Sequence, residues 1–279
     1  MIKLIVSDID GTLLEDGSNV LNPELPEVIL RLRKQGMQFA AASGRQWVSI
    51  ERTFDRIKEK IFYLSDNGAY VGIHGRNLFL NTIEPGVVRQ MVQDIRDEGL
   101  IPLVSGPDVL YIDQGSEEFY DWLVNGYQFR VQRVQDVMQV EEPYIKVSAY
   151  RKTGIDAATR KLREKYHGDM KITISGDMWM DCMASGVSKG EAVRLLQESL
   201  GISPKETMVF GDQMNDIEMM QQAYYSFAVG NARPEVKAAA RFQTDVNVRD
   251  GVLKVLKLLE EDRSLFYGET ERTKRGQRS

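Results

Sequence analysis

Two aspartates separated by one residue, Asp8 and Asp10, are the side chains of this sequence best suited to do chemistry. They follow a run of strand length at residues 2–7 that is apolar apart from Lys3 and Ser7, and they precede Gly11 and Thr12. A buried parallel strand delivers such residues at its carboxyl end, which is where open α/β sheets bind ligands. Two carboxylates this close repel each other unless a cation lies between them or one is protonated. The pair therefore indicates a hard divalent metal, carboxylate acid–base chemistry, or both.

Polar residues also stand where other short apolar runs end. Ser43 and Asn67 follow the next two such runs, Asp212 and Asp216 follow a later one, and Lys189 opens a predicted helix. Because the carboxyl ends of strands converge on one crevice in a doubly wound sheet, these distant positions are candidates for a shared site. A hydroxyl and an ammonium are the donors that the oxygens of a phosphoryl group need.

The four carboxylates at these strand ends indicate a Mg²⁺ site, formed by Asp8, Asp10, Asp212 and Asp216. Mg²⁺ prefers a few carboxylates, keeps several water ligands and accepts substrate phosphate oxygens. The residue types therefore point to metal-assisted chemistry on a phosphorylated ligand.

The elements that must position these residues follow a strand–helix–strand rhythm. Asn22-Pro23 reads as the start of a helix and Gly36 as its end, and a second apolar strand follows at residues 37–42. This βαβ pattern predicts a parallel sheet. From Pro85 to about Gly186 helices alternate with paired short strands instead, which we interpret as a second domain inserted into the first. The first rhythm resumes near residue 188.

Bulk properties set the class of protein. A chain of 279 residues allows one or two domains, and 42% hydrophobic with 28% charged residues is an ordinary globular composition. The net charge of −5 gives no electrostatic footprint for nucleic acid. Nothing in the sequence predicts a signal peptide or membrane segment. The single cysteine, Cys182, excludes an internal disulfide, so we expect a cytoplasmic protein.

Four short motifs, in order, resemble those of the haloacid dehalogenase-like superfamily. They are Asp8-Ile9-Asp10-Gly11-Thr12-Leu13-Leu14, Ser43-Gly44-Arg45, Ser188-Lys189-Gly190 and Gly211-Asp212-Gln213-Met214-Asn215-Asp216. The long insert between the second and third motifs is similar to the cap of the type IIB hydrolases, often called Cof-like sugar-phosphate phosphatases. The resemblance extends from Met1 to about Leu259.

The resemblance implies roles for the acids. Asp8 is then the nucleophile that forms an aspartyl-phosphate, which divides one difficult displacement into two easier ones. Asp10 is the general acid for the leaving alkoxide and afterwards the base for the attacking water, while its backbone carbonyl helps to hold the metal. Asp212 completes the Mg²⁺ site, and Asn215 and Asp216 support it.

The resemblance also implies how the phosphoryl group is held. Ser43 and Lys189 would neutralise its charge, and Lys189 would keep Asp8 ionised. We count further residues as substrate-binding: Gly11, Thr12, Gly44, Arg45, Asn67 and Asn215. For Arg45, contact with the substrate phosphate and a simple ion pair with a neighbouring acid are equally good interpretations.

We therefore expect an α/β fold with a Rossmann-like parallel-sheet core and an inserted α+β cap. The core is assigned to residues 1–84 and 187–270 and the cap to residues 85–186. Residues 271–279 belong to a stretch rich in charge and poor in apolar residues, so we expect a disordered tail there.

The expected activity is Mg²⁺-dependent hydrolysis of a small phosphomonoester, a sugar phosphate or similar metabolite. A phosphomutase of the phosphomannomutase type is the nearer alternative, and a non-catalytic binding or regulatory protein the more distant one. Flavin-precursor, pyridoxal and hexose phosphates all remain open as substrates. Tyr144, Lys146, Trp179 and Asp181 are candidate specificity residues, each with an equally good structural explanation. We expect no nucleic-acid or membrane partner, and the sequence leaves the oligomeric state open.

Overall fold

The computed structural model describes residues 1–15, 18–176 and 178–266, which divide into two compact units. The first unit comprises Met1–Ala42, Thr53–Tyr63 and the chain from Lys189 onward, and the second comprises Ser43–Arg52 and Leu64–Ser188. The predicted tail, residues 271–279, lies outside the described residues. The division into a core of residues 1–84 and 187–270 and a cap of residues 85–186 stays a prediction.

The first unit is built on a parallel sheet. Five strands pair side by side in the order β14-β13-β12-β1-β2, with every pair parallel. Their bounds are β1 (Leu4–Asp8), β2 (Gln38–Ala42), β12 (Thr207–Gly211), β13 (Tyr225–Ala228) and β14 (Phe242–Gln243). This confirms the predicted parallel α/β sheet.

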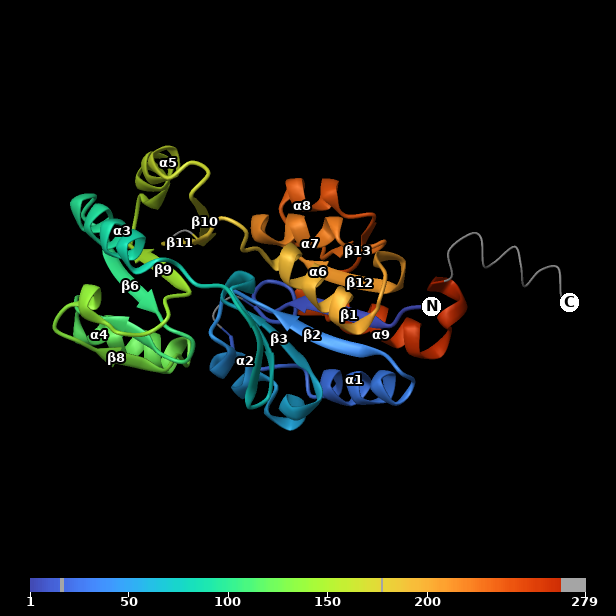
Figure 1. Ribbon diagram of the computed structural model, residues 1–279. Helices are drawn as coiled ribbons and strands as arrows, with labels where there is room; N and C mark the ends of the chain where they lie inside the picture. The colour runs from blue at the N-terminus through green and yellow to red at the C-terminus, as the bar shows by residue number, and fades with distance from the viewer. Residues whose placement is uncertain (16–17, 177, 267–279) are drawn as a thin grey trace, which may run out of the picture. The chain divides into compact units, whose positions relative to one another are not determined.

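Helices cover both faces of these strands. They are α1 (Glu24–Lys34), α6 (Lys189–Leu200), α7 (Ile217–Gln221), α8 (Pro234–Ala239) and α9 (Gly251–Glu261). Figure 1 shows α6, α7 and α8 on one side of the strands and α1 and α9 on the other. Within the described part of the chain, every helix falls short of the length and apolar character that a bilayer-spanning segment requires.

The central strand β1 positions the predicted catalytic end of the sheet. All five of its residues are buried, as expected for a strand covered by helices on both faces. Its register pairs Ser7 with Phe210 of β12 and Asp8 with Ala42 of β2. Asp8 and the residues that follow β12 therefore lie at the same carboxyl edge of the sheet.

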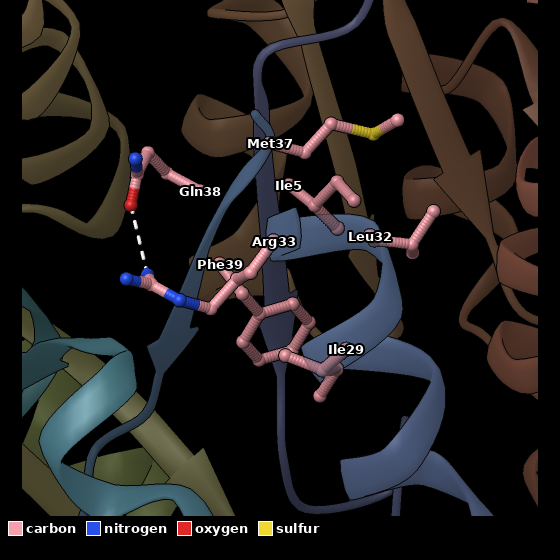
Figure 2. Close-up of a pocket in the computed structure, with 7 residues that line it drawn as sticks. All are labelled: Ile5, Ile29, Leu32, Arg33, Met37, Gln38 and Phe39. Atoms are coloured by element: carbon pink, nitrogen blue, oxygen red, sulfur yellow. Dashed lines mark hydrogen bonds between the residues drawn. The ribbon is translucent and has the colours of Figure 1, made fainter. Parts of the chain in front are cut away.

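Helix α1 closes one face of this sheet with apolar side chains. Figure 2 shows Ile29 and Leu32 of α1 directed toward Ile5 of β1 and Phe39 of β2, around a small apolar pocket. Asn22 accepts a hydrogen bond from the amide of Glu24 at 2.9 Å, so the predicted start of α1 is correct to within one residue.

The second unit contains a mixed sheet in the order β10-β11-β9-β6-β7-β8. Its strands are β6 (Ile101–Ser105), β7 (Leu110–Ile112), β8 (Val131–Arg133), β9 (Lys146–Tyr150), β10 (Met170–Gly176) and β11 (Trp179–Ala184). All neighbouring pairs are antiparallel except β7 and β8, which are parallel. The predicted pairings of residues 101–105 with 109–113 and of 171–175 with 178–183 correspond to β6–β7 and β10–β11.

Further elements complete this unit. They are α2 (Trp47–Thr53), β4 (Tyr70–Ile73), β5 (Arg76–Leu80), α3 (Pro85–Asp97), α4 (Glu117–Asp121) and α5 (Ile155–Lys165). Strand β3 (Phe62–Ser65) runs from the first unit into the second, and β4 and β5 form an antiparallel hairpin.

The two faces of the mixed sheet differ in chemistry. Helices α3 and α5 pack on one face through an apolar cluster that includes Val92, Leu162 and Cys182. On the other face Phe119 of α4 packs against Leu103 and neighbouring apolar side chains of β7. Because paired residues share a face and faces alternate along a strand, β9 and β11 present polar residues on this second face: Lys146, Ser148 and Asp181.

Leu32 tests the packing of α1. Its side chain is 1% exposed, so Leu32→Ala removes buried apolar contacts and leaves a cavity, and we expect it to lower the free energy of unfolding by about 2–5 kcal/mol. Leu258→Ala in α9 is the matched control, because Leu258 is 48% exposed and its truncation should cost less than about 0.5 kcal/mol. Urea unfolding followed by circular dichroism measures both. Equal losses in the two variants would contradict the packing described for α1.

Candidate active site

Three buried carboxylates converge in the first unit. Asp8 ends β1, Asp212 directly follows β12, and Asp216 closes the turn Met214–Asp216. Each contributes an oxygen atom to a group in which all such atoms lie within 4.8 Å of one another. The structure thus brings together residues that are far apart in the sequence, as the position of each at a strand end predicts.

Lys189, the first residue of α6, lies between two of these acids. Its Nζ is 2.5 Å from Oδ1 of Asp8 and 2.7 Å from Oδ1 of Asp216, and the side chain is only 2% exposed. Burial alone would lower the pKa of Lys189, but Asp216 and Asp8 more than offset this and hold the pKa above its ordinary value. The ammonium is therefore charged at any physiological pH.

The pKa values of Asp8 and Asp212 are both raised by their surroundings. Burial raises the pKa of Asp8 well above its usual range, and Asp216 and Asp212 add to this while Lys189 opposes it. Burial and Asp216 likewise raise the pKa of Asp212 to about 6. When all are ionised, three carboxylates and one ammonium leave two negative charges uncompensated. An all-oxygen donor set with this charge fits Mg²⁺.

Asp216 also accepts hydrogen bonds from the backbone, in addition to its ion pair with Lys189. Its Oδ2 accepts hydrogen bonds from the backbone amides of Asp212, at 2.9 Å, and Gln213, at 3.0 Å. The carboxylate therefore holds the loop that carries Asp212. The role of Asp216 in supporting a metal ion stays a prediction.

Gly11 and Thr12 contact Asp212. The Thr12 hydroxyl donates to Oδ1 of Asp212 at 2.8 Å. Gly11 has a φ of +75°, and a Cβ at this position would lie 2.4 Å from Oδ2 of Asp212, so only glycine fits. Asn231 donates from Nδ2 to the carbonyl oxygen of Gly11 at 2.7 Å. Asn231 is missing from the predicted site, although its place in a Gly-Asn-Ala turn shortly after an apolar run is a usable signal.

Asp10 and Asn215 lie beside this cluster in the chain. Asp10 is half-buried two residues beyond β1, and its backbone forms an isolated bridge with Leu14. Asn215 is half-buried in the turn that also contains Asp216. The acid–base role of Asp10 and the metal and substrate contacts assigned to both residues stay predictions.

The other predicted substrate residues belong to the second unit, on two loops that are bonded to each other. The hydroxyl of Ser43 accepts from the amide of Arg45 at 3.1 Å. The backbone N–H of Asn67 donates to the carbonyl oxygen of Ser43, and the backbone N–H of Asp66 donates to the carbonyl oxygen of Arg45, each at 3.0 Å. These bonds hold Ser43, Gly44, Arg45 and Asn67 together within this unit.

Sequence reasoning left further buried polar residues of this unit out of the site. Lys146 pairs with Asp66 at 2.7 Å, and Asp181 accepts a hydrogen bond from Asn67 at 2.9 Å. Lys146 and Asp181 are candidates for specificity in the sequence, but Asp66 is not assigned a role there. Its position directly before Asn67 at a strand end is the signal that was available.

Three buried carboxylates at the carboxyl edge of a parallel sheet, with a buried lysine beside them, form a site whose residue types could hold a divalent cation and contact a phosphoryl group. The sequence model of the haloacid dehalogenase-like hydrolases matches residues 5–256. The chain belongs to this family.

Relatives place the chain among the phosphatases of the family. A 5-amino-6-(5-phospho-D-ribitylamino)uracil phosphatase from Escherichia coli is 28% identical over 257 residues, covering 91% of this chain and 95% of the relative. A solved structure from Eubacterium rectale is 35% identical, covers 92% of this chain and 98% of its own, and has a TM-score of 0.83. A haloacid dehalogenase subclass IIB sugar phosphatase shares the fold, with a TM-score of 0.79 at 22% identity over 91% of this chain and 98% of its own.

The shifted carboxyl groups predict a pH-dependent response to Mg²⁺. A carboxyl whose pKa is raised on folding holds a proton more tightly in the folded than in the unfolded chain. The contribution of Asp212 therefore favours folding at low pH and is lost as pH rises from about 4 to about 6. Mg²⁺ binds the ionised form, so we expect it to raise the melting temperature by at least about 4 °C near pH 7.5 and by much less near pH 5.

Differential scanning fluorimetry with and without Mg²⁺ at the two pH values measures this response. Asp212→Asn should reduce the Mg²⁺ effect at both values, since it removes a donor with a charge. An equal shift of the melting temperature near pH 5 and pH 7.5 would argue against the carboxylate cluster as the binding site.

Proposed function

We propose that this protein is a Mg²⁺-dependent phosphatase that hydrolyses a small phosphomonoester through an aspartyl-phosphate on Asp8. The observation that carries the proposal is the buried cluster of Asp8, Asp212 and Asp216, with Lys189 paired to Asp8 and Asp216. Membership of a hydrolase family and relatives named as phosphatases support it. Asp8, Asp212 and Asp216 would hold the ion, together with the backbone carbonyl of Asp10 and with Asn215 in support.

The chain's own groups prepare Asp8 for attack. Lys189 binds Oδ1 of Asp8, which orients the carboxylate and favours its ionised form. A carboxylate nucleophile divides the hydrolysis into phosphorylation of Asp8 and release of phosphate by water. Bound Mg²⁺ would offset the charge that otherwise keeps an anionic nucleophile away from a phosphate dianion.

Proton transfer is assigned to Asp10. It donates a proton to the leaving alkoxide when Asp8 attacks and later removes a proton from the water that hydrolyses the aspartyl-phosphate. Ser43 and Lys189 are assigned to the oxygens of the transferred phosphoryl group, where a hydroxyl and an ammonium stabilise the charge that a loose transition state spreads over them. Gly11, Thr12, Gly44, Arg45 and Asn67 complete the proposed substrate contacts.

For the substrate, we propose a phosphate ester of a polyhydroxylated carbon chain. The Escherichia coli relative acts on a phosphate carried by a ribityl chain, and sugar phosphates belong to the same chemical class. The inserted segment, residues 85–186, is the proposed cap that selects the leaving group and excludes water during transfer. Such substrates are cytoplasmic metabolites, in keeping with the location expected from the single cysteine.

Asp8→Asn tests the nucleophile. The amide keeps the shape of the carboxylate but is a poor nucleophile, so we expect phosphate release to fall by about 10³-fold or more with the circular dichroism spectrum unchanged. Asp97→Asn, an exposed acid on α3, is the matched control and should retain full activity. Phosphate release from p-nitrophenyl phosphate and from hexose phosphates is the assay. An isomerised hexose phosphate without free phosphate would indicate a phosphomutase instead, and an active Asp8→Asn variant would refute the assignment.

Asp10→Asn tests the general acid. An alkoxide leaving group needs a proton, whereas p-nitrophenolate leaves without one. We therefore expect kcat/KM to fall by about 10²–10⁴-fold for an alkyl phosphate and by clearly less for p-nitrophenyl phosphate. Steady-state kinetics with both substrates gives the comparison. Equal losses for the two substrates would show that Asp10 does not protonate the leaving group.

A further inference from the structure

A second buried group of charged and polar side chains lies in the second unit, and of its members only Asn67 has a proposed role in the chemistry described above. We refer to it as the Lys146 network. Its members come from three strands of the mixed sheet and the loop after β3: Asp66, Asn67, Lys146, Ser148, Ser175 and Asp181. All are buried except Ser175.

Lys146 joins this network to the loop that carries Ser43. Its Nζ lies 2.7 Å from Oδ1 of Asp66 and donates to the carbonyl oxygen of Gly44 at 2.9 Å. Burial alone would lower the pKa of Lys146, but Asp181 and Asp66 raise it above its ordinary value, so the ammonium stays charged. One buried cation of β9 thus holds both the backbone beside Ser43 and the residue before Asn67.

Asp181 fixes the side chain of Asn67. Its Oδ2 accepts from Nδ2 of Asn67 at 2.9 Å and from the hydroxyl of Ser175 at 2.5 Å, and its Oδ1 accepts from the hydroxyl of Ser148 at 2.6 Å. An amide has distinct donor and acceptor ends, so the bond to a carboxylate permits only one orientation of Asn67. The carboxylate is itself held by two hydroxyls from neighbouring strands, β9 and β10.

The backbone under Asn67 requires such support. Asp66 has a φ of 50° and Asn67 a φ of 57°, so two consecutive residues with side chains occupy the left-handed region. Such conformations are unfavourable and persist where the surrounding contacts enforce them, which happens most often at functional sites. Here the backbone N–H groups of Asp66 and Asn67 donate to carbonyl oxygens of the Ser43–Arg45 loop. The Asp66 carboxylate pairs with Lys146, and the side-chain amide of Asn67 donates to Asp181.

We propose that Lys146 and Asp181 are positioning residues of the phosphatase, which set the geometry of Ser43 and Asn67 for binding the phosphoryl group. The proposal rests on the proposed function, because Ser43 and Asn67 are the phosphoryl and substrate contacts assigned there. Neither Lys146 nor Asp181 needs to touch the substrate. Lys146 acts through the backbone carbonyl of Gly44, and Asp181 acts through the side-chain amide of Asn67.

Asp113 offers a matched control in the same unit. Its side chain is 3% exposed and accepts hydrogen bonds from Arg96 and from the amide of Val137. It is therefore a buried carboxylate that links elements of the unit, as Asp181 does. These partners, however, lie on α3 and in the chain after β8, away in sequence from both the Ser43–Arg45 loop and Asn67.

The test compares Asp181→Ala with Asp113→Ala. The melting temperature, kcat and KM with p-nitrophenyl phosphate and Mg²⁺, and the Ki of inorganic phosphate are measured for both. Loss of a hydrogen bond to a charged group predicts that Asp181→Ala raises KM and the Ki of phosphate together by about tenfold, with kcat changed by less than about threefold. Asp113→Ala should lower the melting temperature comparably and leave KM and Ki at wild-type values. If Asp181→Ala lowers only the melting temperature, or if both variants raise Ki equally, the network is structural and the proposal is wrong.

Two milder or complementary variants keep the proposal testable if Asp181→Ala does not fold. Ser148→Ala removes one donor from Asp181 and should raise KM and the Ki of phosphate by about twofold to threefold, and wild-type values would overturn the proposal. Lys146→Met removes the donor to Gly44 and should raise both constants in the same direction. If the Asp8→Asn variant remains active, the proposed function is wrong. If Asp8→Asn is inactive but Ser148→Ala leaves the Ki of phosphate unchanged, only the positioning role is wrong.

Discussion

The first unit depends on one buried ammonium, that of Lys189, placed between the carboxylates of Asp8 and Asp216. Burying an unpaired charge costs several kcal/mol, so the ammonium favours the ionised form of acids that burial would otherwise keep protonated. Lys189 can offset only one of the three carboxylates when all are ionised, and the negative charge then left over is the property a divalent cation requires. The local backbone follows from this arrangement, since Asp216 holds the amides after β12 and Gly11 leaves room for the carboxylate of Asp212.

The carboxylate cluster could be predicted because parallel strands have a simple sequence pattern. Strands β1 and β12 are covered on both faces, so their sequences are mostly apolar, and the ends of these segments mark Asp8 and Asp212. The alternation of strands and helices then places those ends at one edge of the sheet. Lys189 does not follow from such a pattern. A lone lysine at a helix start is usually exposed, and only the order of the four motifs distinguished it.

The polar face of the mixed sheet could not be read in the same way. Strand β9 is not named among the predicted strands, although Lys146 and Ser148 alternate with Val147 and Ala149, a pattern typical of a half-exposed strand. Both polar side chains are in fact buried, since their partners arrive from Asp66 and Asp181, which are far away in the sequence. Residue type and spacing within a segment carry no information about such partners. The bond of Asn231 to Gly11 also spans 220 residues, and only the place of Asn231 in a turn after an apolar run marks it in the sequence.

The two buried lysines also have a consequence for how the chain reaches its native state. Lys189 and Asp8 are separated by 181 residues, and Lys146 likewise meets an acid from a distant segment. A partly folded chain that enclosed either ammonium before its carboxylate arrived would carry a bare charge in a low-dielectric interior. Such states are strongly disfavoured, so closure of each interior is coupled to the docking of remote segments.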